Sequence, residues 1–69
     1  MRLDVFGRFQ VELVRTRDGW QVSRVGQGMR APLDVTIPPD LDEERAIGYL
    51  EDLWHELAAA GQRITRLTR

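Results

Sequence analysis

Nucleophilic chemistry in this chain would have to come from one serine and one histidine, because the sequence contains no cysteine. Ser23 and His55 are therefore the nucleophile and base that a hydrolytic site would need. We expect Ser23 in a strand, on the face turned away from the helix that carries His55, so the two side chains cannot meet. The sequence thus predicts a protein without catalytic residues, and we do not expect an enzyme.

Acidic side chains near His55 raise the question of a metal site. Glu51 and Asp52 precede His55 by four and three residues, so either could share a helical face with it. His55-Glu56 also opens like the zinc motif His-Glu-x-x-His, but Ala59 stands where that motif has its second histidine. Because a stable zinc site needs three or four protein ligands, we expect no metal and no cofactor, and we interpret these residues as a solvated helix face.

Length and composition limit the other function classes. The chain has 69 residues and a formal net charge of -1, which predicts a single domain over residues 1–69 that is too small for a deep cleft. It contains no apolar run long enough to span a bilayer, and residues 1–9 do not resemble a signal peptide. We therefore expect a cytoplasmic protein without a membrane partner.

The near-neutral total charge hides an uneven distribution. Residues 1–33 hold six arginines and three acids, a net of +3. Residues 34–60 hold eight acids and one arginine, a net of -7, and residues 61–69 hold three arginines and no acid, a net of +3. Such asymmetry affects partners and association rather than fold.

Apolar and polar residues alternate along residues 1–14, which is typical of a strand. Gly7 interrupts the alternation. Either one long strand bends at Gly7, or a two-residue loop at Gly7-Arg8 closes a hairpin. The two-residue loop would pair Phe6 with Phe9 and divide the apolar residues between two faces, so the bent strand is favoured.

Asp18-Gly19 predicts a second turn. An Asp-Gly pair between alternating segments is typical of a type I′ hairpin. This loop would pair Arg15 with Val22 and would place Trp20 on the core face of the sheet.

The middle of the chain predicts a loop, a short strand and then a helix. Glycines and a proline indicate a flexible loop over residues 25–32, and alternation indicates a strand over residues 33–37. Asp40 or Asp42 is the expected N-cap of the helix. The expected apolar stripe consists of Ala46, Leu50, Leu53, Trp54 and Leu57.

The alanines at 58–60 should continue this helix as far as Gly61, a natural C′ residue. Residues 62–69 then form a last strand, with Ile64 and Leu67 facing opposite ways. The expected fold class is therefore α+β: a small antiparallel β-sheet in β-β-β-α-β order, with one helix packed on one face.

A sheet covered on one side leaves the other side open. Phe6, Val14 and Val25 are expected on that open face and form our candidate interaction face. Self-association is a common way for a small fold to gain stability. We therefore expect a protein–protein interaction module, with either a protein partner or a second copy of the chain in a homodimer.

Single-stranded nucleic-acid binding is the alternative. Arg2, Arg8 and Arg63 on the arginine-bearing half of the sheet could contact phosphates while exposed aromatic rings stack on bases. The isoelectric point of about 5.7 is far below that of typical nucleic-acid-binding domains, so this alternative is the less favoured one.

Four blocks of sequence together resemble a family of short uncharacterised bacterial proteins. The blocks are Phe6-Gly7-Arg8, Asp18-Gly19-Trp20, Ile37-Pro38-Pro39-Asp40-Leu41 and residues 49–58. The resemblance covers nearly the whole chain and implies a bacterial cytoplasmic protein without an assigned activity. The Asp-Gly hairpin followed by an acid-capped helix is also similar to the HicB-type antitoxin fold, which binds a toxin. The glycine- and proline-rich segment of those strands and their DNA-binding extension are missing here, so that analogy implies a fold and no function.

Overall fold

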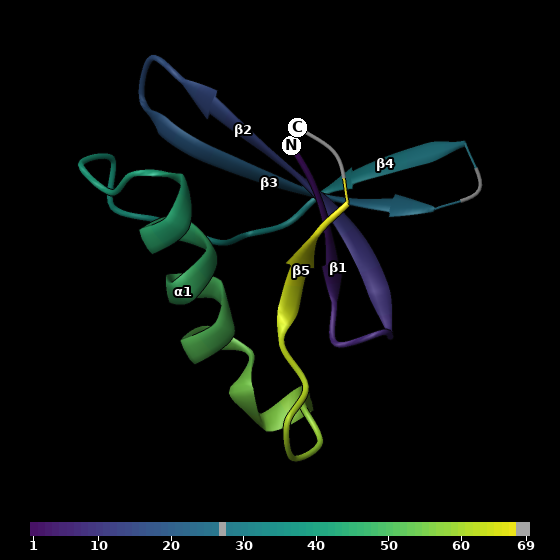
Figure 1. Cartoon of the computed structure of the whole chain (residues 1–69). Helices are drawn as coiled ribbons and strands as arrows, with labels where there is room; N and C mark the ends of the chain where they lie inside the picture. The colour runs from purple at the N-terminus through teal and green to yellow at the C-terminus, as the bar shows by residue number, and fades with distance from the viewer. Residues whose placement is uncertain (27, 68–69) are drawn as a thin grey trace.

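The computed structural model describes residues 1–26 and 28–67 as a five-stranded sheet with one helix (Figure 1). The strands are β1 (Arg2–Val5), β2 (Phe9–Thr16), β3 (Gly19–Gly26), β4 (Met29–Pro32) and β5 (Ile64–Arg66). Helix α1 (Glu43–Leu53) and the 3-10 turn η1 (His55–Leu57) lie between β4 and β5 in the chain. All pairings are antiparallel, in the spatial order β4-β3-β2-β1-β5. The α+β class is confirmed, with four strands rather than three before the helix.

β1 and β2 form a hairpin, so the expected bent strand is wrong. Phe6, Gly7 and Arg8 connect the two strands, and Val5 pairs with Phe9. Phe6 and Gly7 have φ values of 56° and 70°, the positive values that the central residues of a type I′ turn need. The N–H of Arg8 donates to the carbonyl of Val5 at 2.9 Å. The loop therefore has three residues, a length that neither expected arrangement included.

The three-residue loop keeps the apolar residues of both strands together. Directly opposite residues of a sheet share a face, and Leu3 lies opposite Val11. A loop of two residues would have placed them on different faces. Both side chains are fully buried. A loop with an odd number of residues therefore keeps the odd-numbered apolar residues on one face, just as one continuous strand would.

The hairpin at Asp18-Gly19 is confirmed, but its register and turn type differ from the expected ones. Arg15 pairs with Trp20 rather than with Val22. Gly19 has a φ of 130°, while Asp18 does not have a positive φ, so the type I′ turn is wrong. Because the register differs by two residues, Trp20 still lies on the core face.

Gly19 allows the segment before the helix to approach this hairpin closely. A Cβ atom on Gly19 would lie 3.3 Å from the Cβ of Pro39. The Arg15 guanidinium donates to the carbonyls of Pro39 and Leu41 at 2.6 and 2.8 Å, and the indole N–H of Trp20 donates to Leu41 at 3.0 Å. The end of the β2–β3 hairpin thereby positions the N-terminus of α1.

β4 (Met29–Pro32) and the end of β3 take up most of the segment 25–32, so the loop expected there from the glycines and the proline is wrong. β4 pairs with β3, and residue 27 lies outside the described residues. The strand expected over residues 33–37 is wrong, because this segment joins no ladder. Its alternation instead reflects packing: Leu33 and Val35 are half-buried and Ile37 is buried, while the residues between them are exposed.

Helix α1 begins after Asp42, which is the N-cap. A carboxylate oxygen of Asp42 accepts from the N–H of Arg45 at 2.8 Å. The helix ends before Trp54, whose φ and ψ of -107° and 18° leave the helical region. The expected helix over residues 58–60 is wrong, and Gly61 (φ 83°) lies in a later turn instead of capping α1.

The core lies between α1 and one face of the sheet. Its buried residues are Leu3, Val5, Phe6, Val11, Leu13, Val22, Ile37, Ala46, Leu50 and Ile64. Of the expected helix stripe, Ala46 and Leu50 are buried and Trp54 packs against the core from a half-buried position. Leu53 and Leu57 are exposed, so their assignment to the core is wrong.

β5 confirms a last strand, but it spans Ile64–Arg66 and not the whole of the expected segment 62–69. It pairs with β1, and Val5 lies opposite Ile64. Ile64 is buried while Leu67 is exposed, so the two side chains do face opposite ways. Residues 68 and 69 of the expected strand lie outside the described residues.

Candidate functional site

The open face of the sheet, turned away from α1, does not carry the expected apolar patch. Phe6 is 4% exposed and belongs to the core, so its placement on this face is wrong. Val14 is exposed and Val25 is half-buried. Val14 lies opposite Gln21 and Val25 lies opposite Gln10, so the two valines are separated along the sheet and do not form one patch.

A charged cluster occupies the middle of this open face. The Glu12 carboxylate lies 2.6 Å from the Met1 amine, 3.8 Å from Arg2 and 3.7 Å from Arg30. The hydrogen bond from the amine lowers the pKa of Glu12, although partial burial opposes the shift. The open face is thus a polar, ion-paired surface around Glu12.

The three candidate nucleic-acid contacts lie at two ends of the sheet. The β1–β5 register places Arg63 beside the β1–β2 turn that contains Arg8, while Arg2 lies at the far end of β1. Arg2 faces Glu12, and Arg63 donates to Glu51 at 3.0 Å. Arg2 and Arg63 therefore form ion pairs with acidic side chains of the same chain.

Ser23 and His55 are not brought together. Ser23 lies opposite Glu12 on the open face of the sheet. His55 lies in η1, on the side of the sheet that α1 covers, and its Nδ1 is 2.7 Å from the carbonyl of Asp52. Within residues 1–26 and 28–67, no three histidine, aspartate or glutamate side chains are grouped to hold a metal ion.

Glu51 links α1 to β5. Its carboxylate accepts from the Arg63 guanidinium at 3.0 and 3.3 Å and from the backbone N–H of Ile64 at 3.0 Å. The hydrogen bond from Arg63 lowers the pKa of Glu51, with a smaller contribution from Ile64, and the same pair raises the pKa of Arg63. Glu51 therefore holds the tail against the helix.

Large apolar side chains are exposed on α1 and η1, in a surface that we call the helix outer face. It consists of Tyr49, Leu53 and Leu57, whose exposed fractions are 36%, 49% and 40%. Tyr49 and Leu53 are four residues apart and share one side of α1, and Leu57 follows four residues later in η1. Asp52 and Glu56 each follow one of these residues by three positions, and neither forms an ion pair within the described chain. The helix outer face is thus apolar and bordered by the carboxylates of Asp52 and Glu56, with Arg45 four residues before Tyr49.

This surface was not predicted from the sequence, because the spacing assigned Leu53 and Leu57 to the core and gave Tyr49 no role. The four-residue spacing of the three side chains was the available signal. The same spacing also fits the buried stripe of the helix, so it did not distinguish exposed from buried residues. What exposes Leu53 and Leu57 is that α1 ends at Leu53.

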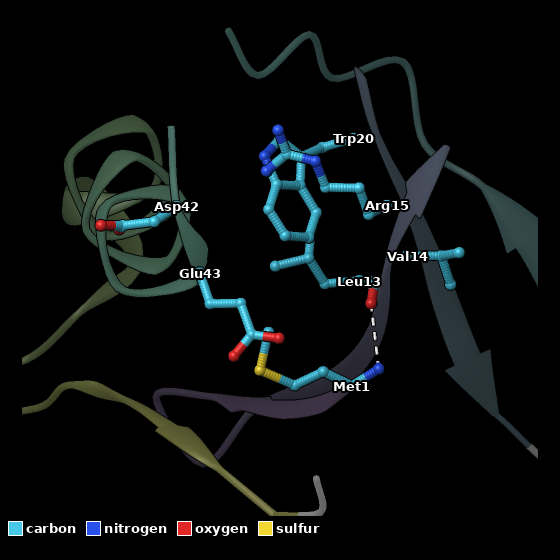
Figure 2. Close-up of a pocket in the computed structure, with 7 residues that line it drawn as sticks. All are labelled: Met1, Leu13, Val14, Arg15, Trp20, Asp42 and Glu43. Carbon is cyan, nitrogen blue, oxygen red and sulfur yellow. Dashed lines mark hydrogen bonds between the residues drawn. The ribbon is translucent and has the colours of Figure 1, made fainter. Parts of the chain in front are cut away.

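A cavity of about 450 Å³ lies between the end of β2 and the first turn of α1. Its lining residues are Met1, Leu13, Val14, Arg15, Trp20, Asp42 and Glu43. Figure 2 shows Arg15 and Trp20 on one side, Asp42 and Glu43 of the helix on the other, and Met1 at the base. The Arg15 guanidinium carbon lies 4.8 Å from the centre of the Trp20 ring. The cavity therefore has apolar walls and one acidic side.

Neither α1 nor any other helix in the described part of the chain has the length and apolar character needed to cross a membrane. No curated protein and no solved structure matches the sequence. A family described as a domain of unknown function (DUF7661) matches residues 1–68. This confirms the expected membership in a family without an assigned activity, and the chain belongs to the DUF7661 family.

Proposed function

We propose that this protein is a non-enzymatic interaction module that docks a partner protein on the helix outer face. The observation that carries the proposal is the exposure of Tyr49 and Leu53 on one side of α1, with Leu57 also exposed in the 3-10 turn that follows. Contiguous exposed apolar side chains rimmed by polar groups are typical of interaction sites. The cytoplasmic location expected from the sequence is part of this proposal.

The charges beside the helix outer face define the partner. Glu43 and Glu51 pair with arginines of the tail, whereas Asp52 and Glu56 form no ion pair in the described chain, and Arg45 is the one basic residue of α1. A segment with apolar side chains flanked by lysine or arginine would satisfy both features, in the manner of an amphipathic helix laid against a complementary face. We therefore assign a basic amphipathic segment of a partner protein as the occupant.

A second copy fits this face less well. A twofold dimer places the same patch of both copies in contact. It would bring Asp52 and Glu56 of both copies into one interface, with Arg45 as the single basic residue of α1 in each copy to offset them, and an excess of like charge across an interface is unfavourable. The expected homodimer is thus disfavoured at the helix outer face.

Photocrosslinking in native cells tests the proposal. p-Benzoylphenylalanine replaces Tyr49 in one variant and Gln21, on the open face of the sheet, in the control. The Tyr49 variant should crosslink to a segment that combines apolar residues with a net positive charge, and Leu53→Asp in the same chain should abolish the product. Equal products from both positions, an acidic captured segment, or no product from the Tyr49 variant would each refute the proposal.

A further inference from the structure

Gly48 lies in the middle of α1, at a position where the fold itself does not need a glycine. Glycine is less favourable than alanine in a helix interior, because it loses more conformational freedom on folding. Gly48 does not have the positive φ that Gly19 and Gly61 have, and a Cβ atom on it would meet nothing within 4 Å. Neither the backbone conformation nor the packing of the described residues therefore excludes a side chain at this position.

The open space at Gly48 is a recess on the outer side of α1. Residues two positions apart in a helix point in nearly opposite directions, so Gly48 points away from the core that contains Leu50. Gly48 is half-buried, while Glu44 and Asp52, one turn before it and one turn after it, are exposed. Tyr49 of the helix outer face is its neighbour in the chain. The recess is therefore open to solvent and bordered by larger side chains.

Charge distinguishes the two ends of this recess. At one end Glu44 is followed by Arg45, the one basic residue of α1, so that end carries little net charge. At the other end Asp52 forms no ion pair within the described chain, and its neighbour Glu51 is already paired with Arg63. A cation of a partner is therefore stabilised more at the Asp52 end.

The backbone of α1 limits the kind of segment that can enter the recess. The N–H and C=O groups in the middle of a helix bond to one another, so an extended segment laid over Gly48 would leave its own facing backbone groups without partners. A helical segment satisfies its own backbone groups. The distance between two packed helices depends on the side chains at their contact, so a glycine at the contact permits a closer approach than any other residue.

We propose that the partner segment is a helix that crosses α1 at Gly48 and places a lysine or arginine at the Asp52 end of the recess. Its apolar side chains lie against Tyr49 and Leu53. The inference rests on the proposed function and adds to it the point of closest contact and the position of the cation. Gly48 then weakens α1 in the free protein, and close packing of the two helices in the complex offsets that loss.

Two substitutions of Gly48 test the proposal, because they should change stability and binding in opposite directions. Alanine and leucine both favour a helix more than glycine does, so Gly48→Ala and Gly48→Leu should each raise the Tm by roughly 4 °C. Photocrosslinking from position 49 at equal expression should capture about fivefold less of the basic segment with Gly48→Ala and about tenfold less with Gly48→Leu. If only apolar area mattered, Gly48→Leu would capture more than wild type.

Charge substitutions at the two ends of the recess locate the cation. Asp52→Lys should lower the product from position 49 about fivefold, whereas Glu44→Lys, the matched control, should lower it less than about twofold.

The outcomes separate this inference from the proposed function. Unchanged product with Gly48→Ala, increased product with Gly48→Leu, or equal effects of Asp52→Lys and Glu44→Lys would overturn the inference and leave the proposed function standing. A lower Tm of Gly48→Ala would also overturn it, because the glycine would then serve the fold. Absence of any product from position 49 without these substitutions would overturn both.

Discussion

Replacement of Glu51 should reveal how much of the stability depends on joining the tail to the helix. The carboxylate binds two kinds of donor: the exposed Arg63 guanidinium and the part-buried N–H of Ile64. Glu51→Ala removes both interactions and leaves the N–H of Ile64 without its acceptor. Glu51→Gln keeps an oxygen for Ile64 but removes the charge. Arg63→Ala removes the ion pair and keeps the backbone bond.

The expected losses follow from these geometries. A hydrogen bond to an ionised acceptor contributes about 1.5–3 kcal/mol, and an exposed ion pair adds at most about 1 kcal/mol. We expect Glu51→Ala to lower the free energy of unfolding by about 2 kcal/mol and Glu51→Gln by about 1 kcal/mol. Arg63→Ala should show the smallest loss of the three. For a domain of this size, about 2 kcal/mol corresponds to a drop in Tm of roughly 10 °C.

The loss should also depend on pH. The pKa of Glu51 is lowered in the folded protein, mainly by the hydrogen bond from Arg63. A lowered folded-state pKa means that the stabilisation is complete above the unfolded pKa, about 4.3 for glutamate, and is lost as the pH falls through the folded value. The difference between wild type and Glu51→Ala should therefore be full at neutral pH and shrink at about pH 3.

Urea denaturation followed by tryptophan fluorescence at both pH values measures these differences, because Trp20 and Trp54 pack against the core. Comparison of each variant with wild type at the same pH cancels the titration of the other carboxylates. Equal losses for Glu51→Ala and Arg63→Ala would show that the Ile64 bond contributes nothing. A difference that stays constant down to pH 3 would refute the charge-dependent part of the reasoning.

Four further substitutions test the fold. Gly48→Ala should stabilise the protein by about 0.5–1 kcal/mol, because a Cβ there contacts nothing within 4 Å in the middle of α1; thermal unfolding measures the gain, and a loss would contradict the open geometry. Gly19→Ala should destabilise by about 1–3 kcal/mol, because its φ is 130° and the new Cβ would press on Pro39; an unchanged Tm would disagree with that turn. Phe6→Ala should cost about 3–5 kcal/mol as a core truncation, whereas Val14→Ala should stay within about 0.5 kcal/mol; similar losses in urea unfolding would contradict the different burial of the two residues.

The alternation of apolar residues predicted which residues face the core more reliably than it predicted which residues pair. Leu3 and Val11 are buried on one face, as a continuous strand would have placed them, yet they belong to two strands. The alternation of apolar and polar positions is the same for a bent strand and for two strands joined by a loop of odd length, so it cannot distinguish them. The same limit applies to Ile37, which is buried in an extended segment that joins no ladder.

Long-range contacts account for what the sequence could not show. Phe6 looked like an exposed residue because its position is even, and a turn with positive φ removes it from the strand alternation altogether. Glu51 looked like a neighbour of His55, but its partners Arg63 and Ile64 come from beyond η1 and the following loop. Asp42, in contrast, was among the two predicted caps because N-capping depends on residues three positions apart.

The charge asymmetry of the sequence takes a specific form in the fold. The basic tail is not a separate positively charged surface, because its arginines form ion pairs with the acidic helix. The pairs are Arg63 with Glu51 and Arg66 with Glu43. This pairing neutralises the side of α1 that faces β5 and leaves Glu44, Asp52 and Glu56 without an ion pair in the described chain, against Arg45 as the one basic residue of α1. Asp52 and Glu56 border Tyr49 and Leu53, so the excess charge and the exposed apolar surface coincide. A basic amphipathic partner would be steered toward the same side of the helix on which it can bury apolar area. Raising the salt concentration should therefore lower the association rate constant and change the dissociation rate constant little.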